Sequence, residues 1–115
     1  MDKILQETLL FDFYGELLTP KQRLFYEMYH LQDFSLSEIG EAQGVSPQAA
    51  RDLIKRTEKI LLRYETILGL VAKYQEQSLL VAELRSRLGL LKESLSDPLL
   101  RKEMEALMNL ADRLI

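Results

Sequence analysis

Two helix-start signals separated by a single glycine constrain this chain more than any other feature of its sequence. Ser35, with Glu38 three residues later, forms a capping box in which each side chain satisfies a backbone donor at the start of a helix. Ser46 followed by Pro47 starts a second helix, because proline is favoured at the first helical position. Gly44 lies between the two signals, and glycine readily adopts the left-handed conformation that ends a helix. The sequence therefore predicts a short helix, a tight turn and a long helix.

A short helix, a tight turn and a second helix with basic residues form a helix-turn-helix motif, which we place over residues 35–63. Such a motif needs a small residue where its helices cross and an apolar anchor before it, and Gly40 and Ile39 fill these positions. The apolar residues expected under the second helix are Val45, Ala50 and Leu53. Gln43 departs from the pattern, because it stands where an apolar side chain would pack under the turn.

The rest of the chain also shows helical patterns, so we predict an all-α protein. It contains neither strand-like alternation of apolar residues nor a hairpin dipeptide such as Asn-Gly. Helices are expected from Asp2 to Leu17, from Pro20 to about Leu31, from Leu36 to Gln43, from Pro47 to a break near Gly69, beyond that break, and after Asp97 and Pro98. We expect a helix-turn-helix domain over residues 1–68 and a C-terminal helical region for dimerisation or docking over residues 69–115.

Apolar residues at helical spacing predict the inward faces of these helices. For the first helix they are Ile4, Leu5, Thr8, Leu9, Phe11, Phe13 and Leu17; for the second, Leu24, Phe25, Met28 and Leu31. The long helix carries Ala50, Ile54, Thr57, Leu61, Tyr64, Leu68 and Val71 on one side. The aromatic side chains of the first two helices belong to this predicted core rather than to a base-stacking platform, with Tyr14 and Tyr26 partly exposed.

Leucines dominate the C-terminal region and leave two interpretations open. A seam runs through Tyr74, Ser78, Val81, Leu84, Leu88, Leu91 and Leu95, and the last helix carries Leu100, Met104, Leu107, Ala111 and Leu114 on one face. The seam could pack within the chain or pair two copies as a coiled coil. We predict a homodimer, because a three-helix N-terminal unit offers limited area to cover so many leucines.

Charge is distributed unevenly along the chain. The formal net charge is −3 and the isoelectric point is about 5.2, yet residues 51–63 carry a local excess of positive charge. This basic stretch begins the long helix of the motif. A local excess of positive charge is typical of a surface that contacts nucleic-acid phosphates. Solvent-exposed helices also commonly carry charged residues that serve solubility alone.

Composition argues against catalysis. The chain has no cysteine, so thiolate zinc sites, disulfides and thiol catalysis are excluded, and its one histidine, His30, cannot assemble a metal site or a catalytic triad. We assign His30 a structural role at the negative end of a helix dipole. No phosphate-binding loop of the G-x-x-x-x-G-K type occurs. We predict a protein that is not an enzyme and has no cofactor.

The same patterns bear on the compartment. The N-terminus lacks the apolar run of a signal peptide, and no stretch approaches the roughly 18 apolar residues of a membrane span. We expect a cytoplasmic protein.

Five blocks of sequence together resemble the YlxM family of small bacterial proteins. They are Phe11-Asp12-Phe13-Tyr14-Gly15, Leu18-Thr19-Pro20-Lys21-Gln22-Arg23, Ser35-Leu36-Ser37-Glu38-Ile39-Gly40-Glu41, Gly44-Val45-Ser46-Pro47-Gln48-Ala49 and Ile54-Lys55-Arg56-Thr57-Glu58-Lys59. The resemblance runs from about residue 8 to residue 65. The same stretch is more distantly similar to region 4 of sigma factors.

The family resemblance implies a helix-turn-helix protein encoded beside the signal recognition particle GTPase Ffh, with a regulatory part in that targeting pathway. The partners it implies are Ffh, its ribonucleoprotein and the receptor FtsY. The sigma-like resemblance implies that the start of the second motif helix reaches base edges and that the preceding helix contacts the backbone.

Carried onto this sequence, these roles give eight candidate residues for DNA or RNA binding: Lys21, Arg23, Ser46, Gln48, Arg51, Lys55, Arg56 and Lys59. In a major groove Gln48 could pair with adenine and Arg51 with guanine. Lys55, Arg56 and Lys59 would bind phosphates instead. Pro47 and Ala49 stand where relatives often carry arginine, which removes donors from the reading end of the helix.

Two hypotheses therefore remain open. The first is a regulator that binds Ffh or its ribonucleoprotein. The second is a transcription regulator that reads duplex DNA with the second motif helix.

Overall fold

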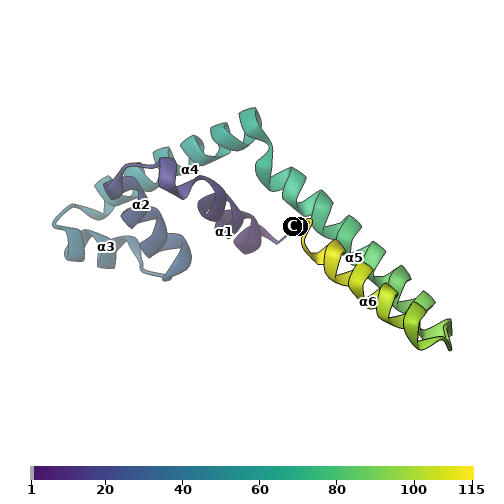
Figure 1. Cartoon of the computed structure of the whole chain (residues 1–115). Coiled ribbons are helices and arrows are strands. Elements are labelled where there is room, and N and C mark those ends of the chain that lie inside the picture. Colours follow the sequence, from purple (N-terminus) through teal and green to yellow (C-terminus); the bar gives the residue numbers. More distant parts are fainter. Residues whose placement is uncertain (1) are drawn as a thin grey trace. The chain divides into compact units, whose positions relative to one another are not determined.

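Residues 2–115 are described by the computed structural model of the chain, and every regular element among them is a helix (Figure 1). In chain order these are α1 (Lys3–Tyr14), a 3-10 turn η1 (Gly15–Leu17), α2 (Pro20–Tyr26), a π-helical turn η2 (Glu27–Leu31), α3 (Leu36–Gln43), α4 (Pro47–Leu68), α5 (Leu70–Ser94) and α6 (Pro98–Asp112). The all-α prediction is confirmed. The chain forms two compact units, Met1–Val71 and Ala72–Ile115, which are described separately below.

Local capping chemistry sets where the helices begin and end. The hydroxyl of Ser35 accepts from the Glu38 N–H at 3.0 Å, and the Glu38 carboxylate accepts from the Ser35 N–H at 3.0 Å. These hydrogen bonds lower the pKa of Glu38. Gly44 and Gly69 end α3 and α4 in the left-handed conformation, with φ of 70° and 64°. The predicted capping box, turn glycine and break near Gly69 are confirmed.

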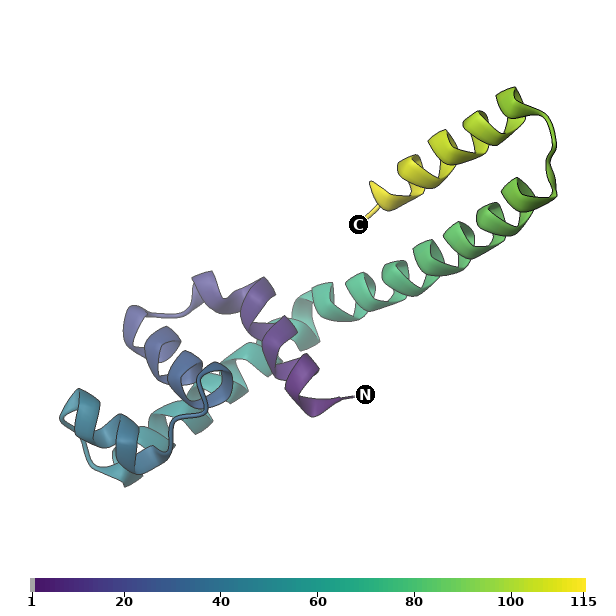
Figure 2. The same ribbon diagram turned by 90° about the horizontal axis from the view of Figure 1, so that it is seen from below.

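The first unit is organised around α4, which packs against α1, α2 and α3. Figures 1 and 2 show these shorter helices gathered along α4. One buried cluster contains Leu10, Tyr14, Leu18, Tyr26, Leu61 and Val71, and a second contains Phe25, Met28, Ile39, Ala50 and Ile54. The predicted inward stripe of α4 is buried at Ala50, Ile54, Thr57 and Leu61. Leu68 was wrongly included in that stripe, because α4 ends there and Gly69 redirects the chain.

The predicted inward face of α1 was wrong in part, since Leu9 and Phe11 do pack against the first cluster. Ile4, Leu5, Phe13 and Leu17 are exposed, whereas Leu10, Tyr14 and Leu18 are buried. The buried residues are four apart, so they form one stripe on a helix and its continuation. Sequence periodicity is ambiguous here because both sides of α1 carry large apolar residues. On the second helix Phe25 and Met28 are buried as predicted, but Leu24 and Leu31 are exposed.

Tyr14 and Tyr26 are fully buried, contrary to the expectation of partial exposure. Each hydroxyl has a hydrogen-bond partner. Tyr14 donates to Glu65 Oε1 at 2.5 Å and accepts from the Leu70 N–H at 3.1 Å, and Tyr26 donates to the Glu7 carbonyl at 2.9 Å. Satisfied hydrogen bonds remove the main cost of burying a phenol. Burial raises the pKa of both tyrosines.

The second unit is a hairpin of α5 and α6, which lie side by side and antiparallel in both views (Figures 1 and 2). Asp97 caps α6 through the Leu99 N–H, as its sequence predicts. Arg85 pairs with Asp112 at 2.5 Å, and Lys92 pairs with Glu105, whose pKa it lowers. Among the described residues from 72 onwards, only Val81 and Ala111 are buried. None of the helices in residues 2–115 has the length and apolar character needed to cross a membrane.

Candidate nucleic-acid interface

Helices α3 and α4 form the helix-turn-helix, and Gly40 lies at their crossing. A Cβ atom at this position would lie 2.5 Å from the carbonyl oxygen of Val45, so no larger residue fits without moving the turn. The Val45 N–H donates to the Gly40 carbonyl at 3.0 Å, which closes the turn. Ile39 beside it is fully buried. The predicted small residue and apolar anchor are therefore confirmed.

Gln43, the departure from the motif, is exposed rather than buried under the turn. Its amide lies 3.8 Å from the sulfur of Met28, a long contact of the kind that a thioether accepts. The buried Met28 side chain packs in the same cluster as Ile39. Met28 of η2 thus supplies apolar packing near the turn, where the motif would otherwise place an apolar side chain at residue 43.

The exposed face of α4 brings together most of the predicted contact residues. At 100° per residue, Gln48, Lys55 and Lys59 lie roughly opposite the buried stripe of α4, and Arg51 continues their row about 90° from that stripe. Arg56 lies at the edge of the same face. A rigid helix therefore presents three or four cations and one amide in a single row.

The N-terminal end of this row is already hydrogen-bonded. Ser46 accepts from the Ala49 N–H at 3.0 Å, so its hydroxyl serves first as the helix cap. The Gln48 amide donates to the Asp52 carboxylate at 3.3 Å, and Arg56 Nε donates to the Asp52 carbonyl at 3.4 Å. Gln48 must leave Asp52 before its amide can pair with a base edge.

Further along the row, the cations differ in how they are engaged. Lys55 forms an ion pair of 3.5 Å with Glu58, and its side chain is 57% exposed. Such exposed pairs are worth little, so a phosphate can displace this one. In the described part of the chain, Lys59 and Arg51 form no ion pair with an acidic residue. These two side chains are the most readily available cations of the row.

Lys21 and Arg23 of α2 are exposed but lie over aromatic rings. The Lys21 ammonium is 5.8 Å from the Phe25 ring centroid, and the Arg23 guanidinium is 6.0 Å from that of Phe11. Cation–π contacts of this length are weak at exposed sites. They hold the two side chains along the surface of α2 without removing their charge.

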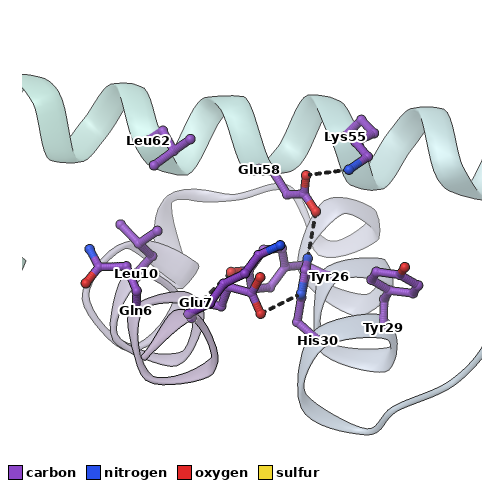
Figure 3. Close-up of a pocket in the computed structure, with 10 residues that line it drawn as sticks. Gln6, Glu7, Leu10, Tyr26, Tyr29, His30, Lys55, Glu58 and Leu62 are labelled. Carbon is purple, nitrogen blue, oxygen red and sulfur yellow. Dashed lines mark hydrogen bonds and ion pairs between the residues drawn. The ribbon is translucent and has the colours of Figure 1, made fainter. Parts of the chain in front are cut away.

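The basic row borders a pocket that sequence reasoning did not find (Figure 3). Its volume is about 490 Å³, and its lining comes from α1, α2, η2 and α4. His30 lies at its centre, with Nδ1 3.0 Å from Glu7 Oε2 and Nε2 2.8 Å from Glu58 Oε1. Lys55 approaches Glu58 from the other side. Glu58 therefore connects the pocket to the row.

The pocket was missed because its hydrogen-bonded residues Glu7, His30 and Glu58 are far apart in the sequence. The helix-dipole role predicted for His30 considers only its own helix, whereas the two carboxylates come from α1 and α4. Tyr26 lies against His30 at a centroid distance of 4.4 Å, and its pKa is raised first by burial and then by the charges of Glu7 and Glu58. Within residues 2–115 no group of three or more His, Cys, Asp or Glu side chains is arranged to hold a metal ion.

Comparison with known proteins agrees with this geometry. Residues 1–104 match a family described as "Putative helix-turn-helix protein, YlxM / p13 like". A relative from Listeria welshimeri is 44% identical over 95% of this chain and 97% of its own length. One from Halalkalibacterium halodurans is 43% identical over 99% and 98%, and one from Exiguobacterium sibiricum is 52% identical over 74% and 80%. The chain belongs to the UPF0122 family of YlxM and p13-like helix-turn-helix proteins.

Proposed function

We propose that this protein acts by binding rather than by catalysis, and that it takes part in the signal recognition particle pathway by binding Ffh or its ribonucleoprotein. The link to Ffh comes from the family resemblance. The proposed RNA contact is supported by the exposed row on α4. In it Lys55, Arg56 and Lys59 lie on or beside one face opposite the core. Cations in such a row bind phosphates without reading sequence.

The alternative is a transcription regulator that inserts the start of α4 into a major groove. Gln48 and Arg51 lie on the exposed side of the first two turns of α4, where base-reading side chains are found in helix-turn-helix proteins. Two observations weigh against base reading. Pro47 and Ala49 offer no side-chain donors, and Gln48 is bonded to Asp52.

A salt titration with two probes tests the proposal. The protein is titrated against the purified Ffh ribonucleoprotein and, separately, against a random-sequence DNA duplex. We expect binding to the ribonucleoprotein at a salt concentration at which the duplex does not bind. Tight, steeply salt-dependent binding to the duplex, with none to the ribonucleoprotein, would contradict the proposal and support the alternative.

Substitutions in the row separate phosphate contacts from base contacts. Lys59→Ala should weaken binding to every nucleic acid alike and reduce the salt slope by about 1. Arg51→Ala should relax sequence preference only if α4 reads DNA. Lys102→Ala in α6 removes an exposed lysine outside the motif and serves as the matched control.

We also propose that the protein is a homodimer in the cytoplasm, with FtsY as a further partner in the same pathway. The support for a dimer is the number of leucines that the second unit leaves exposed.

A further inference from the structure

The leucines exposed on the α5–α6 hairpin are not scattered, because most of them lie on one side. Taking the direction from α5 to α6 as reference, Leu80, Leu84 and Leu91 lie about 100° to one side at 100° per residue. On α6, Leu100, Leu107 and Leu110 lie at a similar angle from the direction to α5. Because the helices are antiparallel, the two rotations bring both stripes to the same side of the hairpin.

The opposite side of the hairpin is polar. It carries Ser86 and Glu93 on α5 and Arg101 and Asn109 on α6, all exposed. The ion pairs that join the helices, Arg85 with Asp112 and Lys92 with Glu105, also lie toward this side. The hairpin therefore has one apolar face, made of the two leucine stripes, and one polar face.

The leucines of the apolar face also lie in layers. The two ion pairs fix the register, since residues 85 and 92 on α5 are level with residues 112 and 105 on α6. Leu91 is then level with Leu107, and Leu84 with Leu114 in the turn that ends α6, each within one residue. The layers are seven residues apart on both helices, which is the spacing of packed helical bundles.

Layers with equal spacing on both helices make the face complementary to itself. A twofold axis parallel to the helices places α5 of one copy over α6 of the other and keeps every layer at its own height. Each layer then holds four leucines. This arrangement is a four-helix bundle in which every neighbouring pair of helices is antiparallel.

Charge favours this pairing over α5 on α5. Arg87 borders the stripe on α5, and Glu103 lies within the stripe on α6. Placing α5 over α6 of the partner sets helices that carry opposite charges against each other. Placing like helices together would bring the arginines of the two α5 helices nearer to each other, and likewise the glutamates of the two α6 helices, which costs free energy.

The area is sufficient for a stable dimer. The 15 residues of α6 span about 22 Å, and two neighbouring helices are about 20 Å wide. The flat outline is then about 450 Å² on each copy, and its ridges add accessible surface. The pair thus reaches the roughly 1,000 Å² in total that a specific interface must bury.

We infer that the leucine face of the α5–α6 hairpin binds the same face of a second copy, with α5 over α6 of the partner, to form a four-helix bundle. This inference rests on the proposed homodimer and names its surface. It does not depend on whether the protein binds RNA or DNA, and it is tested without nucleic acid.

Sedimentation equilibrium of the full chain tests the surface. The wild type should sediment as two copies of the 13.4 kDa chain at micromolar concentration. Leu91→Glu should raise the dimer dissociation constant at least about 100-fold, because it buries an unpaired charge. Leu90→Glu is the matched control, since Leu90 is 66% exposed on the neighbouring side of α5 and its substitution should leave the dimer intact.

A monomeric wild type, or equal effects of the two substitutions, would overturn the inference. The wild type could also be monomeric and lose its binding to the Ffh ribonucleoprotein when Leu91 is replaced by Glu. That result would overturn the inference too, because the leucine face would then bind another protein. Far-ultraviolet circular dichroism of each variant establishes that its helices are retained. Loss of nucleic-acid binding by a protein that remains dimeric would instead count against the proposed function alone.

Disulfide trapping tests the pairing of helices. The chain has no cysteine, so Leu84→Cys and Leu114→Cys can be prepared as two single variants. Oxidation of their mixture should give a covalent dimer, because residues 84 and 114 face each other across copies. Either variant alone should trap little. Efficient trapping of Leu84→Cys by itself would show α5 lying on α5 and would overturn the proposed arrangement.

Discussion

The two units of this chain are both made of helices rich in apolar residues, yet the first buries many more of these residues than the second. In the first unit α4 has three neighbouring helices, and its stripe from Ala50 to Leu61 is almost inaccessible to solvent. In the second unit each helix has one neighbouring helix. Within the described hairpin only Val81 and Ala111 are buried. Burial depends on the number of helices that pack against each face. In the proposed dimer, the helices of the partner would supply the missing neighbours.

The largest expected effect is on the crossing of α3 and α4. Gly40→Val should destabilise the first unit by about 3 kcal/mol or more, because the side chain would displace the Val45 backbone. Urea unfolding followed by tyrosine fluorescence measures this, since four of the five tyrosines lie in the first unit. A stable variant with an unchanged midpoint would show that the turn relaxes freely.

A truncation on each unit sharpens the contrast between them. Leu61→Ala should cost about 2–5 kcal/mol, because Leu61 is fully buried. Leu90→Ala, at an exposed position of the hairpin, should change the free energy of unfolding by less than about 0.5 kcal/mol. The same urea titration measures both. Similar losses would mean that the two units are equally packed.

Alkaline pH should destabilise the first unit selectively. The pKa values of Tyr14 and Tyr26 are raised above the ordinary value of 10.0, so the folded state holds these protons more tightly than the unfolded state. The stability from these groups is full below pH 10 and is lost as the pH rises above it. The loss is roughly 1.4 kcal/mol per pH unit for each tyrosine that stays protonated only when folded.

Absorbance of tyrosinate against pH, together with circular dichroism, checks this prediction. Ionisation of the two buried tyrosines should coincide with unfolding. Tyr29→Phe removes a tyrosine that is 38% exposed and should leave the transition in place. Ionisation of all five tyrosines without unfolding would contradict the burial of Tyr14 and Tyr26.

The smallest expected effect is a gain in the hairpin. Gly89→Ala should stabilise α5 by about 0.5–1 kcal/mol, because a helical glycine is unfavourable and the added Cβ would lie 3.9 Å from Met108 Cε. Thermal unfolding measures the gain. A loss of thermal stability would mean that the hairpin is packed too tightly at Gly89 to hold the added methyl group.

Much of the fold could be predicted because its signals are local. Ser35 with Glu38, Ser46 with Pro47, and Asp97 with Pro98 each start a helix through contacts within three residues. The glycines that end α3 and α4 were found for the same reason. Local hydrogen bonds do not depend on the rest of the molecule, so the sequence alone reveals them.

The candidate site also has one part that local spacing predicts and one part that it does not. The row of Gln48, Arg51, Lys55 and Lys59 follows from helical spacing, whereas the bonds of His30 to Glu7 and Glu58 join three distant segments. No pattern in the neighbourhood of His30 indicates those partners. The inward face of α1 was likewise beyond the sequence, because two of its sides are apolar enough to be buried.

The sequence by itself determined the all-α class, the capped starts of the helices, the helix-turn-helix and the cations on α4, since each depends on residues within a few positions of one another. The tertiary structure decided which side of α1 is buried, how Tyr14 and Tyr26 satisfy their hydroxyls, and how Glu7, His30 and Glu58 meet. It also brought the leucines of α5 and α6 to one face. These outcomes depend on contacts between helices, whose free energies are settled only when the whole set packs together.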